Sequence, residues 1–217
     1  MKNVPYGQYI VAGEVFMQKG EETKSRIRQA GFELFHQRGY HSTSMNDIVE
    51  NTGVKKGNLY FHYGSKEDLA IEVLRDAVNR YNSYINSRIS GTSTEQKLHD
   101  IIDAVYDYHT QPGKFLGCIF GNMALETGGS GSELEQFIRE LFSKWTYMFK
   151  KHIVSGINSG DFKPREDPDV LAGMILASIE GGIMLSKVSG SIEQFRQCRD
   201  FIKSVVSERA VCCGRKE

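Results

Sequence analysis

The chain has 217 residues, of which 40% are hydrophobic and 25% charged, a composition typical of a globular protein with one large or two modest domains. Its 27 basic and 27 acidic residues balance, so attraction to a polyanion must come from a local basic patch. No uninterrupted apolar run is long enough to span a membrane, and no signal-peptide pattern opens the chain. These features predict a cytoplasmic protein without a membrane partner.

Residues 1–20 share no pattern with the rest of the chain, and we interpret them as a loosely ordered extension. A first helix is predicted from about Glu21. Its apolar and small residues repeat at the spacing of one helix face: Ile27, Ala30, Gly31, Leu34 and Phe35. Arg38 in the last turn and Gly39 after it indicate where this helix ends.

A second, short helix is predicted after Thr43 or Ser44, either of which can cap it, and before Gly53. Asp47 lies three residues after Ser44, which approaches a capping box. A third helix begins near Lys55. Two short helices joined by a tight, glycine-containing turn are the signature of a helix-turn-helix, whose second helix enters the DNA major groove. The sequence therefore predicts a DNA-binding head.

The residue types around the third helix suit contacts with DNA. Asn58 carries a donor and an acceptor that can read adenine, and Gly57 allows close backbone approach. Val54, Leu59 and Tyr63 are expected to pack inside the head. A solvated charged face would explain any one of the other residues alone, but their combination favours DNA. The predicted DNA contacts, with Lys66 pairing with a phosphate, are Thr43, Ser44, Lys55, Lys56, Gly57, Asn58, Tyr60, Phe61, His62 and Lys66.

Residues 23–70 resemble the DNA-binding head of the TetR family of bacterial repressors. The resemblance rests on AGFELFHQRGYHSTSMNDIVENTGVKKGNLYFHYGSKEDL, in which Tyr63 stands where the family usually has Phe. It implies an all-α fold, with an N-terminal three-helix helix-turn-helix head on a larger helical body for ligand binding and dimerisation. It further implies a homodimeric repressor that binds a palindromic double-stranded DNA operator and is released by a small-molecule effector.

The rest of the chain predicts six further helices. They cover 67–89, a segment capped by Ser93 or Thr94 that ends before Pro112, a short stretch within 117–127, 133–158, 170–188 opened by Asp167 or Asp169, and 192–206. We therefore expect an extension at 1–20, a head at 21–66, a body at 67–208 and a tail at 209–217.

Apolar and aromatic residues of the central helices suit a small-molecule pocket, although each of them also suits a packed core. The predicted ligand contacts are Tyr106, His109, Phe115, Cys118, Met123, Trp145, Met148 and Phe149. Glu180 is interpreted either as a hydrogen-bonded core acid or as the counter-charge for a cationic ligand.

The last two helices of the resembling family pair with a symmetry mate as a four-helix bundle. The predicted dimer contacts are Gly173, Ala177, Gly181, Phe195 and Ile202, with an internal core helix as the alternative.

Two alternatives to a reversible effector remain open. Cys118 opens a helix whose dipole can lower a thiol pKa, and GCIFGNMALE resembles a segment of some thiol- or electrophile-responsive TetR-like regulators. The repressor would then be switched by electrophile or oxidant modification of Cys118; a buried structural cysteine is the competing interpretation. A helical small-molecule-binding enzyme is the alternative from another class. The sequence lacks catalytic motifs, metal-ligand spacing and a phosphate-binding loop, so we predict no enzyme activity, no metal and no cofactor.

Overall fold

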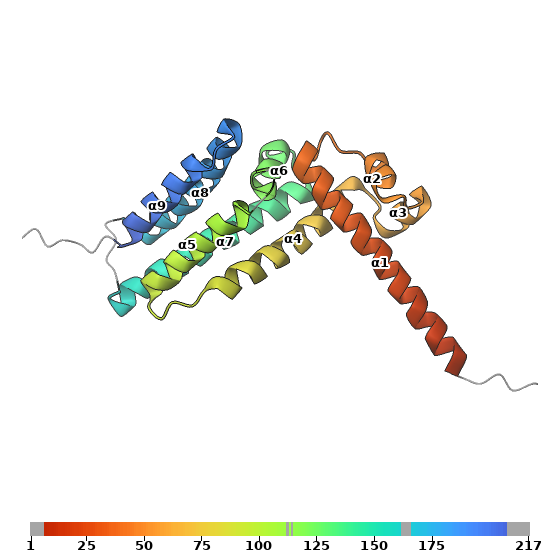
Figure 1. The fold of residues 1–217 in the computed structure, drawn as a ribbon, viewed down its shortest axis with the longest axis horizontal. Coiled ribbons are helices and arrows are strands. Elements are labelled where there is room, and N and C mark those ends of the chain that lie inside the picture. Colours follow the sequence, from red (N-terminus) through yellow and green to blue (C-terminus); the bar gives the residue numbers. More distant parts are fainter. Residues whose placement is uncertain (1–6, 112, 114, 162–165, 208–217) are drawn as a thin grey trace, which may run out of the picture. The chain divides into compact units, whose positions relative to one another are not determined.

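The structure, a computed structural model, describes residues 7–111, 113, 115–161 and 166–207, with side chains from Gly20 onward. All regular structure in these residues is α-helical (Figure 1), which confirms the predicted all-α class. The helices are α1 (Gly7–Arg38), α2 (Met45–Thr52), α3 (Lys56–His62), α4 (Lys66–Arg88), α5 (Thr94–His109), α6 (Ile119–Thr127), α7 (Glu133–Ser159), α8 (Pro168–Ser189) and α9 (Glu193–Ser207). The chain forms two compact units, Met1–Ala77 and Val78–Glu217.

Helix α1 begins at Gly7, well before the predicted start at Glu21, so the expectation of a loose segment is wrong for residues 7–20. The reason is local. No proline lies between Gly7 and Arg38, and the glycines within this stretch each cost only about 1 kcal/mol of helix stability relative to alanine. Residues 1–6 lie outside the described residues.

Side-chain caps and glycines set the limits of α2. The hydroxyl of Ser44 accepts a hydrogen bond from the amide of Asp47, and the carboxylate of Asp47 accepts one from the amide of Ser44, which completes the capping box. Gly53 follows the helix in the left-handed conformation, with φ of 67°. Glycine adopts this conformation without the steric cost of a side chain, so Gly53 ends α2 as predicted.

Close packing joins the helices of the first unit. Val54, Leu59 and Tyr63 are buried, as predicted from the sequence. At Gly31 a Cβ atom would lie 2.9 Å from Cγ2 of Val73, so the absence of a side chain lets α1 approach the first half of α4. The buried side chain of Leu59 anchors α3 in the core of this unit.

In the second unit, α8 contacts both α7 and α9, and α5 contacts both α7 and α9. The ribbon shows α8 and α9 running side by side (Figure 1). Ser93 caps α5 and Asp167 caps α8, which decides between the alternatives that the sequence left open at each position. The amide of Phe195 donates a buried hydrogen bond of 2.9 Å to the Ser186 hydroxyl, which fixes the start of α9 against α8.

Helix α8 is long and apolar enough to cross a membrane by length and composition, contrary to the expectation that no such segment exists. The core helix of a soluble protein passes the same test, so this is weak evidence for a membrane segment. One side of α8 is buried in the second unit through Leu171, Ile175, Ile179 and Ile183.

Candidate DNA-binding surface and ligand cavity

Helix α3 presents basic, amide and aromatic side chains to solvent. Lys55, Lys56, Gly57 and Asn58 are exposed, and the side chain of Phe61 is 85% exposed although it is apolar. Tyr60 is exposed on the same short helix, where the ammonium of Lys56 lies 5.9 Å from the centre of its ring, and His62 is half-buried. Because Val54 and Leu59 anchor the opposite side, these groups face outward together and can reach the edges of bases and the phosphates beside them.

Two of the hydroxyl residues predicted to touch DNA have internal partners. Thr43 is only 1% exposed, and its hydroxyl donates to the carbonyl oxygen of Gly39 at 2.8 Å. Its amide donates to Tyr40, so the prediction of a DNA contact by Thr43 is wrong, and the residue instead stabilises the turn before α2. Ser44 is exposed, but its hydroxyl and amide both bond to the carboxylate of Asp47. These hydrogen bonds lower the pKa of Asp47, which keeps the carboxylate ionised.

Lys66 also differs from the prediction. Its ammonium donates to the carbonyl oxygens of Tyr40 and Thr43, each at 3.0 Å, and lies 4.3 Å from the centre of the Tyr40 ring. These bonds satisfy carbonyls of the turn before α2 and tie that turn to the start of α4. The structure therefore assigns Lys66 a role in holding the head together, in place of the predicted phosphate contact.

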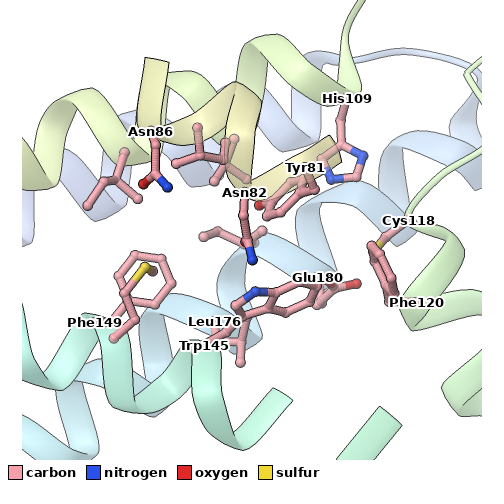
Figure 2. A pocket seen from close by; sticks show the side chains of 15 residues that line it. Tyr81, Asn82, Asn86, His109, Cys118, Phe120, Trp145, Phe149, Leu176 and Glu180 are labelled. Carbon is pink, nitrogen blue, oxygen red and sulfur yellow. The ribbon is translucent and has the colours of Figure 1, made fainter. Parts of the chain in front are cut away.

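A cavity lies within the second unit and offers about 50 Å³ to the centres of water molecules, enough for a few waters. Helices α4 to α8 and the N-cap of α6 supply its walls (Figure 2). The residues that line it are Tyr81, Asn82, Ile85, Asn86, Ile101, Val105, His109, Cys118, Phe120, Trp145, Met148, Phe149, Leu176, Ile179 and Glu180.

Five of the eight predicted pocket residues line this cavity: His109, Cys118, Trp145, Met148 and Phe149. The other three do not. Met123 is fully buried in the core, Tyr106 packs on Phe195 with ring centres 5.1 Å apart, and Phe115 lies in the loop before α6. The sequence interpretation missed the contribution of α4. Its signal was present in the sequence, because Tyr81 and Ile85, like Asn82 and Asn86, are one helical turn apart and so share a face.

Tyr81, His109, Cys118 and Glu180 lie toward one side of the cavity, and the amide of Asn86 lies toward the other (Figure 2). Protein surrounds the Glu180 carboxyl, and this burial raises its pKa to about 7 although a hydrogen bond with the Cys118 thiol opposes the shift. Burial also raises the pKa of the Tyr81 hydroxyl. Both side chains keep some accessible surface because they face the cavity.

Cys118 is the N-cap of α6, as the sequence suggested, and its sulfur accepts a hydrogen bond of 3.4 Å from the Gly121 amide. Of the two interpretations that the sequence left open, the structure favours the buried structural cysteine over a thiol of lowered pKa. Burial, with the side chain 3% exposed, and the neighbouring Glu180 raise the pKa of the thiol well above its usual value. The desolvation cost exceeds the stabilisation by the helix end, so the thiol is protonated and poorly nucleophilic in this conformation.

The predicted dimer contacts divide between two environments. Phe195 and Ile202 are buried within the chain itself, with exposures of 1% and 2%, so their assignment to a partner surface is wrong. Gly173, Ala177 and Gly181 lie on one side of α8. A Cβ atom added at Gly173 or at Gly181 would meet nothing within 4 Å, so this side is open. Large apolar side chains are exposed on the same helix, namely Val170, Met174, Met184, Leu185 and Val188, and Phe201 is exposed on α9. We call this set the α8 surface.

Comparison with known proteins agrees with both units. The family described as bacterial regulatory proteins, tetR family, matches residues 27–73, and the tetracyclin repressor-like C-terminal domain matches residues 94–202. The HTH-type transcriptional repressor DhaR of Mycobacterium sp. (strain GP1) is 28% identical over 85% of this chain and 90% of its own. The HTH-type transcriptional regulator LmrA of Bacillus subtilis is 28% identical over 76% of this chain and 86% of its own.

Among solved structures, a TetR transcriptional regulator from Chloroflexus aurantiacus J-10-FL superposes with a TM-score of 0.80 and 26% identity, covering 88% of this chain and 98% of its own. These relatives are transcriptional regulators rather than enzymes, which confirms the prediction that the protein is not an enzyme. Because the two family matches fall on a helix-turn-helix unit and a helical body in this order, the chain belongs to the TetR family of bacterial transcriptional regulators.

Proposed function

We propose that this protein is a cytoplasmic, homodimeric repressor that binds a palindromic operator through α3 and releases it when a small molecule occupies the cavity of the second unit. The observation that carries the proposal is the outward set on α3, with Asn58 and Phe61 beside two exposed lysines. A two-fold dimer presents two such helices, and an operator read by it has matching half-sites.

The α8 surface supports dimerisation. Exposed apolar side chains recur along α8 at the spacing of successive helical turns, while its opposite side is buried. A contiguous apolar surface of this kind is typical of protein–protein contacts. Pairing with a second copy would remove it from water, and such pairing is typical of the family.

The cavity supports regulation by a ligand. It is too small in this state for a drug-sized molecule, so an effector has to displace its walls. One wall is α4, a continuous helix that begins in the DNA-binding unit at Lys66. An effector that prefers the state with a displaced α4 lowers operator affinity by its differential affinity for the two states. A trigger at Cys118 would first require exposure of a buried, protonated thiol, so we favour a reversible effector.

Selection of bound fragments from a random DNA library, followed by mobility-shift titration, tests the DNA interface. Asn58→Ala should weaken binding to the selected sequence by roughly 1–3 kcal/mol and leave binding to random DNA unchanged, because a base contact is lost. Lys55→Ala should weaken both and lower the salt dependence by about one unit, since a phosphate contact is lost. If both variants bound selected DNA like the parent at every salt concentration, α3 would not be the reading element.

A further inference from the structure

The ionisable side chains among the described residues that line the cavity include an acid but no lysine or arginine. Glu180 is the single carboxylic acid among them. His109 is the only lining side chain in that set that can become cationic. A carboxylate, sulfonate or phosphate ligand would therefore lack a permanent counter-charge and would face the Glu180 carboxyl. The chemistry of the lining disfavours an anionic effector.

Space for the Glu180 carboxyl is built into α6. At Gly121 a Cβ atom would collide with Oε2 of Glu180, so a larger residue at this position would make the end of this side chain shift. The Cys118 thiol, one helical turn earlier, forms a hydrogen bond with the same carboxyl. Gly121 and the Cys118 thiol thus both lie against the Glu180 carboxyl at the cavity wall.

Aromatic rings surround the remaining space. The ring of Trp145 lies 5.4 Å from that of Tyr81 and 5.2 Å from that of Phe120, and the three come from α7, α4 and α6. In Figure 2 Glu180 lies beside Trp145 and on the same side of the cavity as Cys118 and Phe120. Ring faces attract cations, and the attraction is stronger where water is excluded. A buried acid beside three rings is therefore complementary to a positive charge attached to an apolar group.

Building on the proposed function, we infer that the effector is a small organic cation of the alkyl- or arylammonium class. Its charge pairs with Glu180, and its apolar part packs on the rings of Tyr81, Phe120 and Trp145. A neutral ligand, with Glu180 acting only as a protonated partner of Cys118, is the competing outcome, and fluorescence titration separates the two.

The chain contains a single tryptophan, and Trp145 lines the cavity, so tryptophan fluorescence reports occupancy of this site. The probes are three molecules of similar size: the cation trimethylphenylammonium, its neutral isostere tert-butylbenzene and the anion benzenesulfonate. We expect the cation to bind at least about tenfold more tightly than either of the others. Glu180→Gln should remove this preference, whereas Glu140→Gln, an equal charge change on α7 outside the cavity, should keep it.

Equal affinity for the neutral and cationic probes, or a preference that survives Glu180→Gln, would overturn the inference. A lack of response to all three probes would overturn it as well, since the proposed class includes the cation tested. Circular dichroism of Glu180→Gln establishes that the variant is folded, and mobility shift with selected DNA is measured in parallel. Retained DNA binding with failed cation binding would reject the ligand class and leave the proposed DNA-binding function intact. Loss of DNA recognition in the parent protein would reject that function.

Discussion

At the scale of single residues, Lys66 shows how a basic side chain beside a DNA-reading helix acquires an internal role. Its ammonium bonds to the carbonyl oxygens of Tyr40 and Thr43 and also lies over the Tyr40 ring. A hydrogen bond from a charged donor to a half-buried carbonyl stabilises a fold more than a neutral one does. The turn before α2 consequently depends on a residue that lies 26 and 23 positions away in the chain.

Lys66→Met removes the ammonium and keeps most of the stem. We expect it to lower the free energy of unfolding by roughly 1–3 kcal/mol, because two carbonyls lose their donor. Lys55→Met, the matched change at an exposed lysine, should alter stability by less than about 0.5 kcal/mol. Urea unfolding measures both. If Lys66→Met left stability unchanged and reduced the salt dependence of DNA binding, the result would support the predicted phosphate contact and contradict the structural role.

Glu180 makes stability depend on pH. Its pKa rises from 4.5 in the unfolded chain to about 7 in the folded protein, so the folded state holds a proton that the unfolded state releases. The resulting stabilisation is complete below pH 4.5 and is lost as pH rises through 7. The shift corresponds to about 3 kcal/mol. Interaction with Glu180 contributes to the raised pKa values of Tyr81 and Cys118, and both groups stay protonated over this range.

We expect the unfolding free energy of the parent protein to fall by about 3 kcal/mol relative to Glu180→Gln as pH rises from about 4.5 to about 8. Glutamine has the same shape and does not ionise, so the difference between the two proteins isolates this group. Chemical denaturation across that pH range supplies the measurement. A difference that stays constant with pH would show that Glu180 titrates as an exposed acid.

At the scale of elements, α8 and α9 make a close helix contact at Gly182, a residue that is not among the predicted dimer contacts. A Cβ at Gly182 would lie 3.0 Å from Sγ of Cys198 and 3.1 Å from Cα of Phe195, whereas one at Gly181 would meet nothing within 4 Å. The small residue that permits close approach inside the chain is therefore Gly182. Gly181 faces away, toward the α8 surface.

Gly182→Ala should destabilise the protein by roughly 1–3 kcal/mol, because α9 must move to accommodate the methyl group. Gly181→Ala should instead gain about 0.5–1 kcal/mol from the lower flexibility of the unfolded helix segment. Thermal and urea unfolding at several protein concentrations distinguish effects on the fold from effects on association. The reverse order of stabilities would mean that the helix pair packs in a different rotation.

At the scale of the whole molecule, the α8 surface leaves several large apolar side chains exposed to water in a single chain. Met174, Met184 and Val188 are each at least half exposed on a helix whose opposite side is buried. Burial of such side chains stabilises an interface by about 25 cal/mol for each Å² removed from water. A two-fold contact uses every residue of the surface twice, which multiplies the effect of any single change.

Met184→Arg should convert the proposed dimer to a monomer at micromolar concentration, because two unpaired charges would be buried at a cost of several kcal/mol. The fold of each chain should survive, since Met184 is 50% exposed in the isolated chain. Tyr147→Arg, at a site on α7 that is 66% exposed, is the matched control and should remain dimeric. Sedimentation velocity measures the outcome. A Met184→Arg dimer as tight as the parent would place the interface elsewhere.

Local signals in the sequence determined the all-α class, the limits of most helices and the inward residues of the head. The capping box of Ser44 and Asp47 and the left-handed Gly53 act between near neighbours in the chain, so their residue types suffice to predict them. The start of α1 was mispredicted because the sequence changes character near Glu21 without containing a helix-breaking residue. The amphipathic pattern begins near Glu21, but the helix itself already begins at Gly7.

Tertiary structure alone decided which partners each side chain meets. Helical periodicity identifies an apolar face but does not name the helix that covers it, so Phe195 was assigned to a partner chain and Tyr81 was left out of the cavity. The thiol of Cys118 illustrates the same limit in electrostatics. The helix end that lowers its pKa is visible in the sequence, whereas the burial and the Glu180 carboxyl that raise it depend on residues far along the chain. Desolvation and pairing are properties of the assembled core, and here they reverse the local effect.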